Sequence, residues 1–130
     1  MPDAAPRSIL LVEDDPIVRM LMVDVLEDAG HHVIEADGWD TAIAVLANPA
    51  QAVALLITDV GLGGTPDRDG LGLAREALRL REGLPVLVAS GYVGPGGGTG
   101  EALDIPPGAE QIGKPFSIDQ LRDKVQGLLA

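Results

Sequence analysis

The chain has 130 residues, a length typical of one domain, and 46% of them are hydrophobic, which excludes a disordered chain. It contains no cysteine, which excludes disulfides and thiolate metal sites. The net charge of −11 argues against nucleic acid as a direct partner, because a phosphate backbone favours clustered Lys and Arg. With neither a signal peptide nor an apolar run of membrane-spanning length in the sequence, we expect a cytoplasmic protein that does not bind membranes.

Short apolar runs alternate with helical patterns along the chain. Nearly continuous apolar runs predict buried parallel strands at 8–12, 54–58 and 85–89, and weaker patterns predict two more strands at 32–36 and 109–113. Apolar positions repeating every three or four residues predict helices at 16–29, 39–46 and 70–81. A last helix begins after Ser117, which forms a capping box with Gln120. This alternation predicts a doubly wound, flavodoxin-like α/β fold with a five-stranded parallel sheet, over residues 8–130, after a disordered extension at 1–7.

The segment between the fourth and fifth strands departs from this pattern. Residues 94–100 are mostly glycine, and each glycine inside a helix costs about 1 kcal/mol relative to alanine. We therefore expect the fourth helix to be short or disordered. Two interpretations stay open: a segment that folds on binding a partner, or a neutral linker.

Polar residues with a common chemistry follow four of the predicted strands. Asp14 and Asp15 follow the first strand, Asp59 the third, Ser90 the fourth and Lys114 the fifth. The carboxyl ends of parallel strands share one edge of the sheet, where such folds bind their ligands. Neighbouring carboxylates repel each other, and a divalent cation such as Mg²⁺ (or Mn²⁺) relieves this repulsion while binding phosphate oxygens. The set is suited to phosphoryl transfer onto an aspartate.

Each of these residues also has a simpler interpretation when it is taken alone. Asp15, directly before Pro16, is a good helix N-cap. Lys114 is an ordinary exposed lysine in that view, and Asp59 begins a turn. The functional interpretation depends on five residues falling together at the same edge of the sheet.

The motifs around these positions resemble the receiver domain of bacterial two-component response regulators, in its single-domain, chemotaxis-type form. The matching pieces are LLVEDDP at 10–16, LITD at 56–59, DG at 69–70, VASG at 88–91 and KPF at 114–116. The resemblance implies that Asp59 is the phospho-acceptor. It also implies that Asp15 and Asp59 bind Mg²⁺ directly together with the backbone carbonyl of Gly61, and that Asp14 acts mainly through water.

The same resemblance implies a switch. Ser90 is then the hydroxyl that moves toward the phosphoryl group, Lys114 pairs with that group, and the Lys114–Pro115 peptide bond is expected to be cis. The sequence departs from the family at Gln111, where the aromatic switch residue usually stands. Tyr92 is a candidate substitute, or a loop aromatic that shields the site.

A second departure is the loop over residues 60–69, which is about three residues longer than in the simple chemotaxis-type receiver. It is either a feature that reshapes partner recognition or a tolerated surface insertion.

The expected function is a phosphorylation switch. A sensor histidine kinase or a histidine phosphotransfer protein donates to Asp59, and the changed surface binds a downstream protein that the sequence does not identify. We expect no conventional enzyme, only self-catalysed phosphorylation and dephosphorylation, in a monomer or weak homodimer.

Two alternatives remain: a degenerate receiver that binds partners without phosphorylation, and the receiver segment of a hybrid histidine kinase. A phosphatase of the haloacid type ranks lower, because Gly61 stands where that family has a second Asp.

Overall fold

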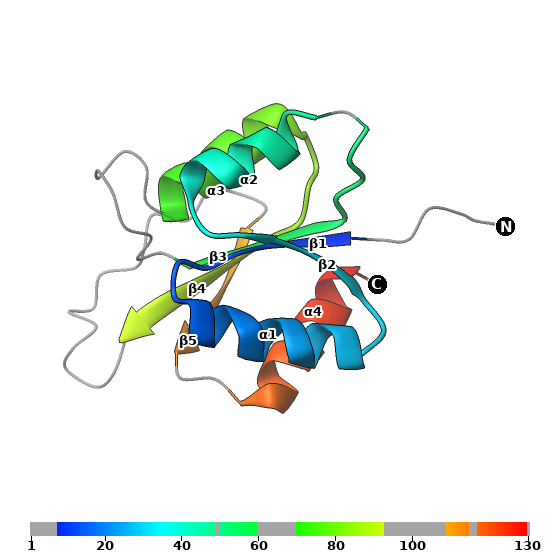
Figure 1. Cartoon of the computed structure of the whole chain (residues 1–130), viewed down its shortest axis with the longest axis vertical. Helices are drawn as coiled ribbons and strands as arrows, with labels where there is room; N and C mark the ends of the chain where they lie inside the picture. Colours follow the sequence, from blue (N-terminus) through cyan, green and yellow to red (C-terminus); the bar gives the residue numbers. More distant parts are fainter. Residues whose placement is uncertain (1–7, 49, 60–69, 93–108, 115–116, 130) are drawn as a thin grey trace, which may run out of the picture.

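The chain forms a five-stranded parallel sheet between two pairs of helices (Figure 1). The computed structural model describes residues 8–48, 50–59, 70–92, 109–114 and 117–129. Its elements are β1 (Ser8–Val12), α1 (Pro16–Asp28), β2 (His32–Ala36), α2 (Trp39–Leu46), β3 (Leu55–Asp59), α3 (Gly70–Leu80), β4 (Val86–Tyr92), β5 (Ala109–Lys114) and α4 (Ile118–Leu129). The predicted fold class is confirmed. The glycine-rich segment, where a short or disordered helix was expected, lies outside the described residues, as do residues 1–7 and the loop at 60–69.

The strands lie in the order β2-β1-β3-β4-β5, and each neighbouring pair is parallel. Successive side chains of a strand point to opposite faces, so each central strand contributes to two separate cores. Leu10 and Leu56 pack with α2 and α3 on one face, whereas Leu11 and Ile57 pack with α1 and α4 on the other. Both faces are covered, which explains why the central strands β1 and β3 are apolar along most of their length. Among the described helices, none is long and apolar enough to span a membrane.

Local sequence fixes the ends of the helices. Asp15 caps α1 and Pro16 occupies its first turn, where a missing backbone N–H costs nothing. Gly30 follows the end of α1 with a φ of 97°, a conformation that glycine adopts without strain. At α4 the expected capping box is present: the Gln120 amide donates to Ser117 Oγ at 3.0 Å, and the Ser117 amide donates to Gln120 Oε1 at 2.8 Å.

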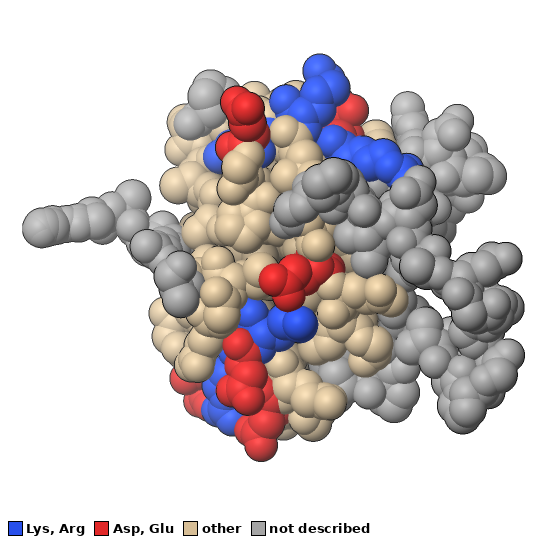
Figure 2. All heavy atoms as spheres, turned by 180° about the vertical axis from the view of Figure 1, so that it is seen from behind, with Lys and Arg blue, Asp and Glu red and all other residues tan. Residues whose placement is uncertain are grey.

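Basic side chains lie beside acidic ones on the face shown in Figure 2. Two described ion pairs belong to α4: Lys124 Nζ lies 3.1 Å from Glu110 Oε1 of β5, and Arg122 Nη2 lies 2.6 Å from Asp119 Oδ1. Arg79 pairs with Glu76 within α3. These arginines and this lysine therefore do not form a patch of uncompensated positive charge.

Candidate functional site

The parallel register brings the residues that follow β1 next to the end of β3. Val12 is the register partner of Thr58, so the next residues along the two strands are Glu13 and Asp59. The Glu13 amide also donates to the Ala36 carbonyl at 3.1 Å, which continues the pairing of β1 with β2 by one residue. Glu13 and Asp59 therefore leave the sheet side by side at its carboxyl edge.

Three carboxylates meet at this edge. Oxygen atoms of Glu13, Asp14 and Asp59 all lie within 4.8 Å of one another. Glu13 is buried, with 2% of its surface exposed, Asp59 is partly buried and Asp14 is exposed. Mg²⁺ prefers oxygen ligands and keeps several waters, so a group of three carboxylates with one side open to solvent fits this ion and Mn²⁺. A phosphate group could approach from the same open side.

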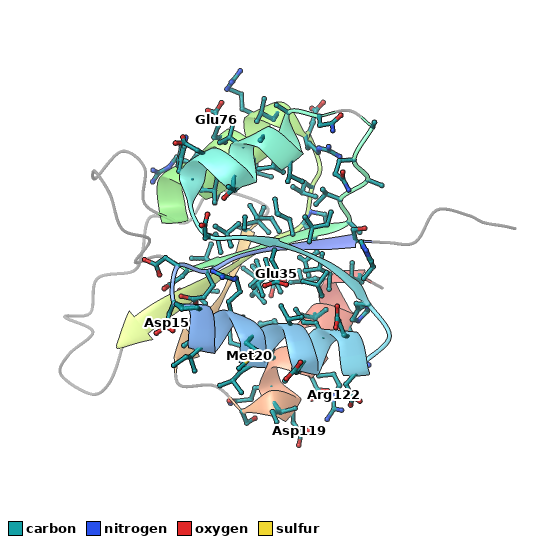
Figure 3. All side chains as sticks on the ribbon, viewed as in Figure 1. Asp15, Met20, Glu35, Glu76, Asp119 and Arg122 are labelled. Atoms are coloured by element: carbon teal, nitrogen blue, oxygen red, sulfur yellow. The ribbon has the colours of Figure 1, made fainter. Side chains whose placement is uncertain are left out.

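The structure differs from the sequence-based prediction at Asp15. This side chain was expected to bind the metal directly, but it points back onto its own helix. Asp15 Oδ1 accepts hydrogen bonds from the amides of Ile17 at 2.9 Å and Val18 at 3.3 Å. Figure 3 shows Asp15 at the start of α1. A carboxylate that satisfies two free amides of a helix N-terminus gains about 1 kcal/mol there, which explains its orientation.

Glu13, and not Asp15, lies with Asp14 and Asp59 in the group of three carboxylates. Sequence reasoning missed it, although one signal was present. The apolar run of β1 ends at Val12, so the next residue, Glu13, is the one that continues alongside Asp59 in the parallel register. Glu13 Oε2 also accepts a hydrogen bond from the Asp15 amide at 3.2 Å, which links the carboxylate group to the helix cap.

The backbone places Ser90 and Lys114 at the same edge of the sheet. Ala89 is the register partner of Asp59, and Ser90 follows it and pairs with Gly113 of β5. A shift in register between Ser90 and Tyr92 then brings Tyr92 opposite Lys114. β4 thus runs three residues beyond its predicted end at Ala89, and Ser90 and Lys114 still lie at the predicted edge of the sheet.

Several predicted details fall outside the described part of the chain. These are the Gly61 carbonyl, the Lys114–Pro115 peptide bond, and the side chains of Ser90, Tyr92 and Lys114. Gln111, at the position of the usual switch aromatic, is half-buried on β5 and borders an open groove between β5 and α4.

Comparisons with known proteins agree with this fold. Residues 9–126 match the family model of the response regulator receiver domain, and the chain belongs to this family. It is 31% identical over 123 residues to the response regulator receiver protein CpdR of Brucella abortus, covering 95% of this chain and 97% of CpdR. It is also 31% identical over 124 residues to the sensor kinase CckA of the same organism, covering 94% of this chain but only 12% of the kinase.

Solved structures show the same similarity. A CheY-like receiver domain protein from Methanospirillum hungatei matches with a TM-score of 0.79 and 26% identity, over 96% of this chain and 94% of that one. The receiver domain of the hybrid histidine kinase CckA matches with a TM-score of 0.75 and 28% identity, over 95% and 99% of the two chains. The chain is therefore similar both to a protein of its own length and to a segment of a long kinase.

Proposed function

We propose that Asp59 accepts a phosphoryl group in a reaction that requires a divalent cation held by Glu13, Asp14 and Asp59. The observation that carries the proposal is the convergence of these three carboxylates within 4.8 Å at the carboxyl edge of the sheet. Asp59 is the member that ends a strand in the middle of the sheet, between β1 and β4. Membership of the receiver family supports the same assignment.

The transfer is a direct displacement at phosphorus. A carboxylate oxygen of Asp59 forms the new bond, and the bond from phosphorus to the donor atom breaks, with its electron pair leaving on the donor. The cation, when bound, supplies positive charge that offsets the charge of the carboxylates and the phosphate oxygens. The resemblance to receivers assigns the remaining phosphate oxygens to Lys114 and Ser90. Water then attacks the phosphorus of the acyl phosphate, the bond from phosphorus to the Asp59 oxygen breaks, and inorganic phosphate leaves while the Asp59 carboxylate is restored.

The donor is a phosphohistidine protein, either a sensor kinase or a phosphotransfer protein, that docks on α1. Among the described residues, four large apolar side chains are exposed: Ile17 by 65%, Met20 by 57% and Leu21 by 57% on α1, and Ile118 by 59% on α4. Ile17 lies in the first turn of α1, and its amide bonds to Asp15 directly after the carboxylate group. A donor that covers these side chains would bury apolar surface beside the acceptor.

We expect phosphorylation to change the surface at the β5 edge of the sheet, which lies opposite the β2 edge. β5 and α4 border the groove that includes Gln111, and Ser90 and Tyr92 lie on the neighbouring strand β4. We propose that the phosphorylated state changes this surface, which then binds a downstream protein. The chain remains a monomer or weak homodimer and is no conventional enzyme, since it acts only on its own side chain.

Incubation with acetyl phosphate tests the proposal, because a small donor needs no docking surface. The intact mass is followed with Mg²⁺, with EDTA, and in the Asp59→Asn variant. We expect a gain of one phosphoryl group only in the wild type with Mg²⁺. If the folded wild-type protein binds Mg²⁺ but gains no mass, the degenerate receiver that binds partners without phosphorylation becomes the better interpretation, and Gln111 is the residue that favours it.

A further inference from the structure

Arg19 reaches from the second turn of α1 back to the loop that carries the carboxylates. Its Nη1 donates a hydrogen bond to the Glu13 carbonyl at 2.8 Å. Its Nε donates to Glu35 Oε1 of β2 at 3.2 Å. The Arg19 side chain is only 21% exposed, whereas that of Glu35 is 53% exposed. The guanidinium thus joins β2 to the loop after β1 in a partly buried position.

The bond to the Glu13 carbonyl fixes the part of the loop that matters for the site. The Glu13 carbonyl and the Asp14 amide belong to one planar peptide group, so holding the carbonyl also holds the Asp14 amide and Cα in place. The other bonds in the loop act on the neighbouring groups: the Glu13 amide donates to Ala36, and the Asp15 amide donates to Glu13 Oε2. The bond from Arg19 reaches this peptide plane from α1.

Glu35 in turn orients Arg19. Glu35 lies on the same face of β2 as Val33, which packs with the core beneath α1. Its carboxylate is therefore placed to accept a hydrogen bond from Arg19 Nε, while Nη1 donates to the Glu13 carbonyl in the loop. The planar guanidinium presents both donors in one rigid group, which a lysine ammonium does not do.

We propose that Arg19 is a positioning residue, which holds the Glu13–Asp14 peptide so that both carboxylates face Asp59 and bind the divalent cation together. The inference rests on the proposed function, because it concerns the same cation site. A second possible effect of Arg19 has the opposite sign. Its positive charge lies near the site and repels a cation, so charge alone would make binding tighter when Arg19 is removed.

The test measures Mn²⁺ affinity of the full chain by electron paramagnetic resonance of the free ion, with Mn²⁺ standing in for Mg²⁺. The variants are Arg19→Ala and Arg19→Lys, and the matched control is Arg79→Ala, which removes the same charge from the last turn of α3. We expect Arg19→Ala to raise the Kd about 10-fold, the size typical of losing a group that orients a metal ligand. Arg19→Lys keeps the charge and should still lose most of the affinity, whereas Arg79→Ala should bind like the wild type.

A readout without metal accompanies the titration. In ¹H–¹⁵N spectra of the metal-free protein, the Asp14 and Asp15 amide signals should shift in Arg19→Lys and stay in place in Arg79→Ala. If Arg19→Ala does not fold, as judged by circular dichroism, Arg19→Lys carries the test.

Unchanged or tighter Mn²⁺ binding in the folded Arg19 variants would overturn the inference and leave the proposed function standing. Full affinity in Arg19→Lys would overturn it too, because the two donors of the planar guanidinium would then not be needed. A wild-type protein that binds no Mn²⁺ would overturn both proposals.

Discussion

Val12 and Thr58 are register partners in neighbouring parallel strands, and this pairing decides which carboxylates meet at the edge of the sheet. The two residues that follow them, Glu13 and Asp59, come together with Asp14 within 4.8 Å. Parallel strands that end in acidic residues therefore create a local concentration of negative charge, which a cation relieves.

This repulsion should be measurable as a change in stability. Two unit charges 4 Å apart in water interact by about 1 kcal/mol, so Asp59→Asn should raise the free energy of unfolding by about that amount in EDTA. Mg²⁺ at 100 times its Kd should stabilise the wild type by about 2.7 kcal/mol and the variant by much less. Thermal unfolding with and without Mg²⁺ measures both effects. The control Asp123→Asn, on the exposed side of α4, should keep the full response to Mg²⁺; an equal loss in this control would contradict a localised site.

Substitutions at Glu13 and Asp15 should change different properties: those at Glu13 the Mg²⁺ affinity, and those at Asp15 the stability. Asp15→Ala removes the cap of α1 and should cost about 1 kcal/mol of stability, with Mg²⁺ binding retained. Asp15→Asn keeps a capping oxygen and should leave both properties near the wild type. Glu13→Gln keeps an oxygen for the Asp15 amide but loses the charge, so Mg²⁺ affinity should fall about 10-fold. Calorimetric titration and thermal unfolding of the three variants check these expectations. Loss of Mg²⁺ binding in Asp15→Asn would show that Asp15 does bind the metal, as the sequence predicted.

Substitution of Arg81 should lower the free energy of unfolding and leave phosphorylation unchanged. Its guanidinium donates to the carbonyls of Leu46 at 3.1 Å, Val45 at 3.4 Å and Asn48 at 2.8 Å, at the end of α2. Arg81→Ala leaves these carbonyls without their cationic donor and should cost about 2 kcal/mol. Denaturant unfolding measures the loss. Arg79→Ala, two residues away on an exposed ion pair, should unfold like the wild type, and phosphorylation by acetyl phosphate should be unaffected in both.

The apolar surface on α1 should matter only for a protein donor. Ile17→Asp places a charge where the donor is proposed to bury apolar surface, and it should slow transfer from a histidine-phosphorylated protein that phosphorylates the wild type. The rate with acetyl phosphate should stay the same, because that donor needs no docking. Ala44→Asp is the matched control, since it is exposed on α2 in the other helical layer. The rates are measured by quenching both reactions at a series of times. If Ile17→Asp slows phosphorylation by both donors equally, the substitution has damaged the site and not a docking surface.

Most of the fold was predictable because its elements carry strong local signals. The strand ranges agree with the observed ones within a residue for β1, β2, β3 and β5. The signal is strongest in β1 and β3, because buried parallel strands are nearly continuous apolar runs. β4 extends to Tyr92, beyond its apolar run, because pairing with β5 continues past a register shift. Backbone pairing of this kind leaves no mark in the hydrophobic pattern.

The site was harder to predict in detail. Glu13, Asp14 and Asp15 are consecutive, and three adjacent acidic residues look alike in the sequence. Their roles depend on where β1 stops and which carboxylate turns back to cap α1, and both depend on the tertiary arrangement. Arg19 shows the same limit: its bond to the Glu13 carbonyl depends on the reach of a long side chain, which residue spacing alone does not show.

Locating the phosphoryl group tests the central claim most directly. After reaction with acetyl phosphate and Mg²⁺, borohydride converts an aspartyl phosphate into homoserine, which peptide mass spectrometry can assign to one position. We expect homoserine at residue 59, in the sample with Mg²⁺ and not in the sample with EDTA. Homoserine at another aspartate, or its formation at residue 59 without any divalent cation, would contradict the proposed site.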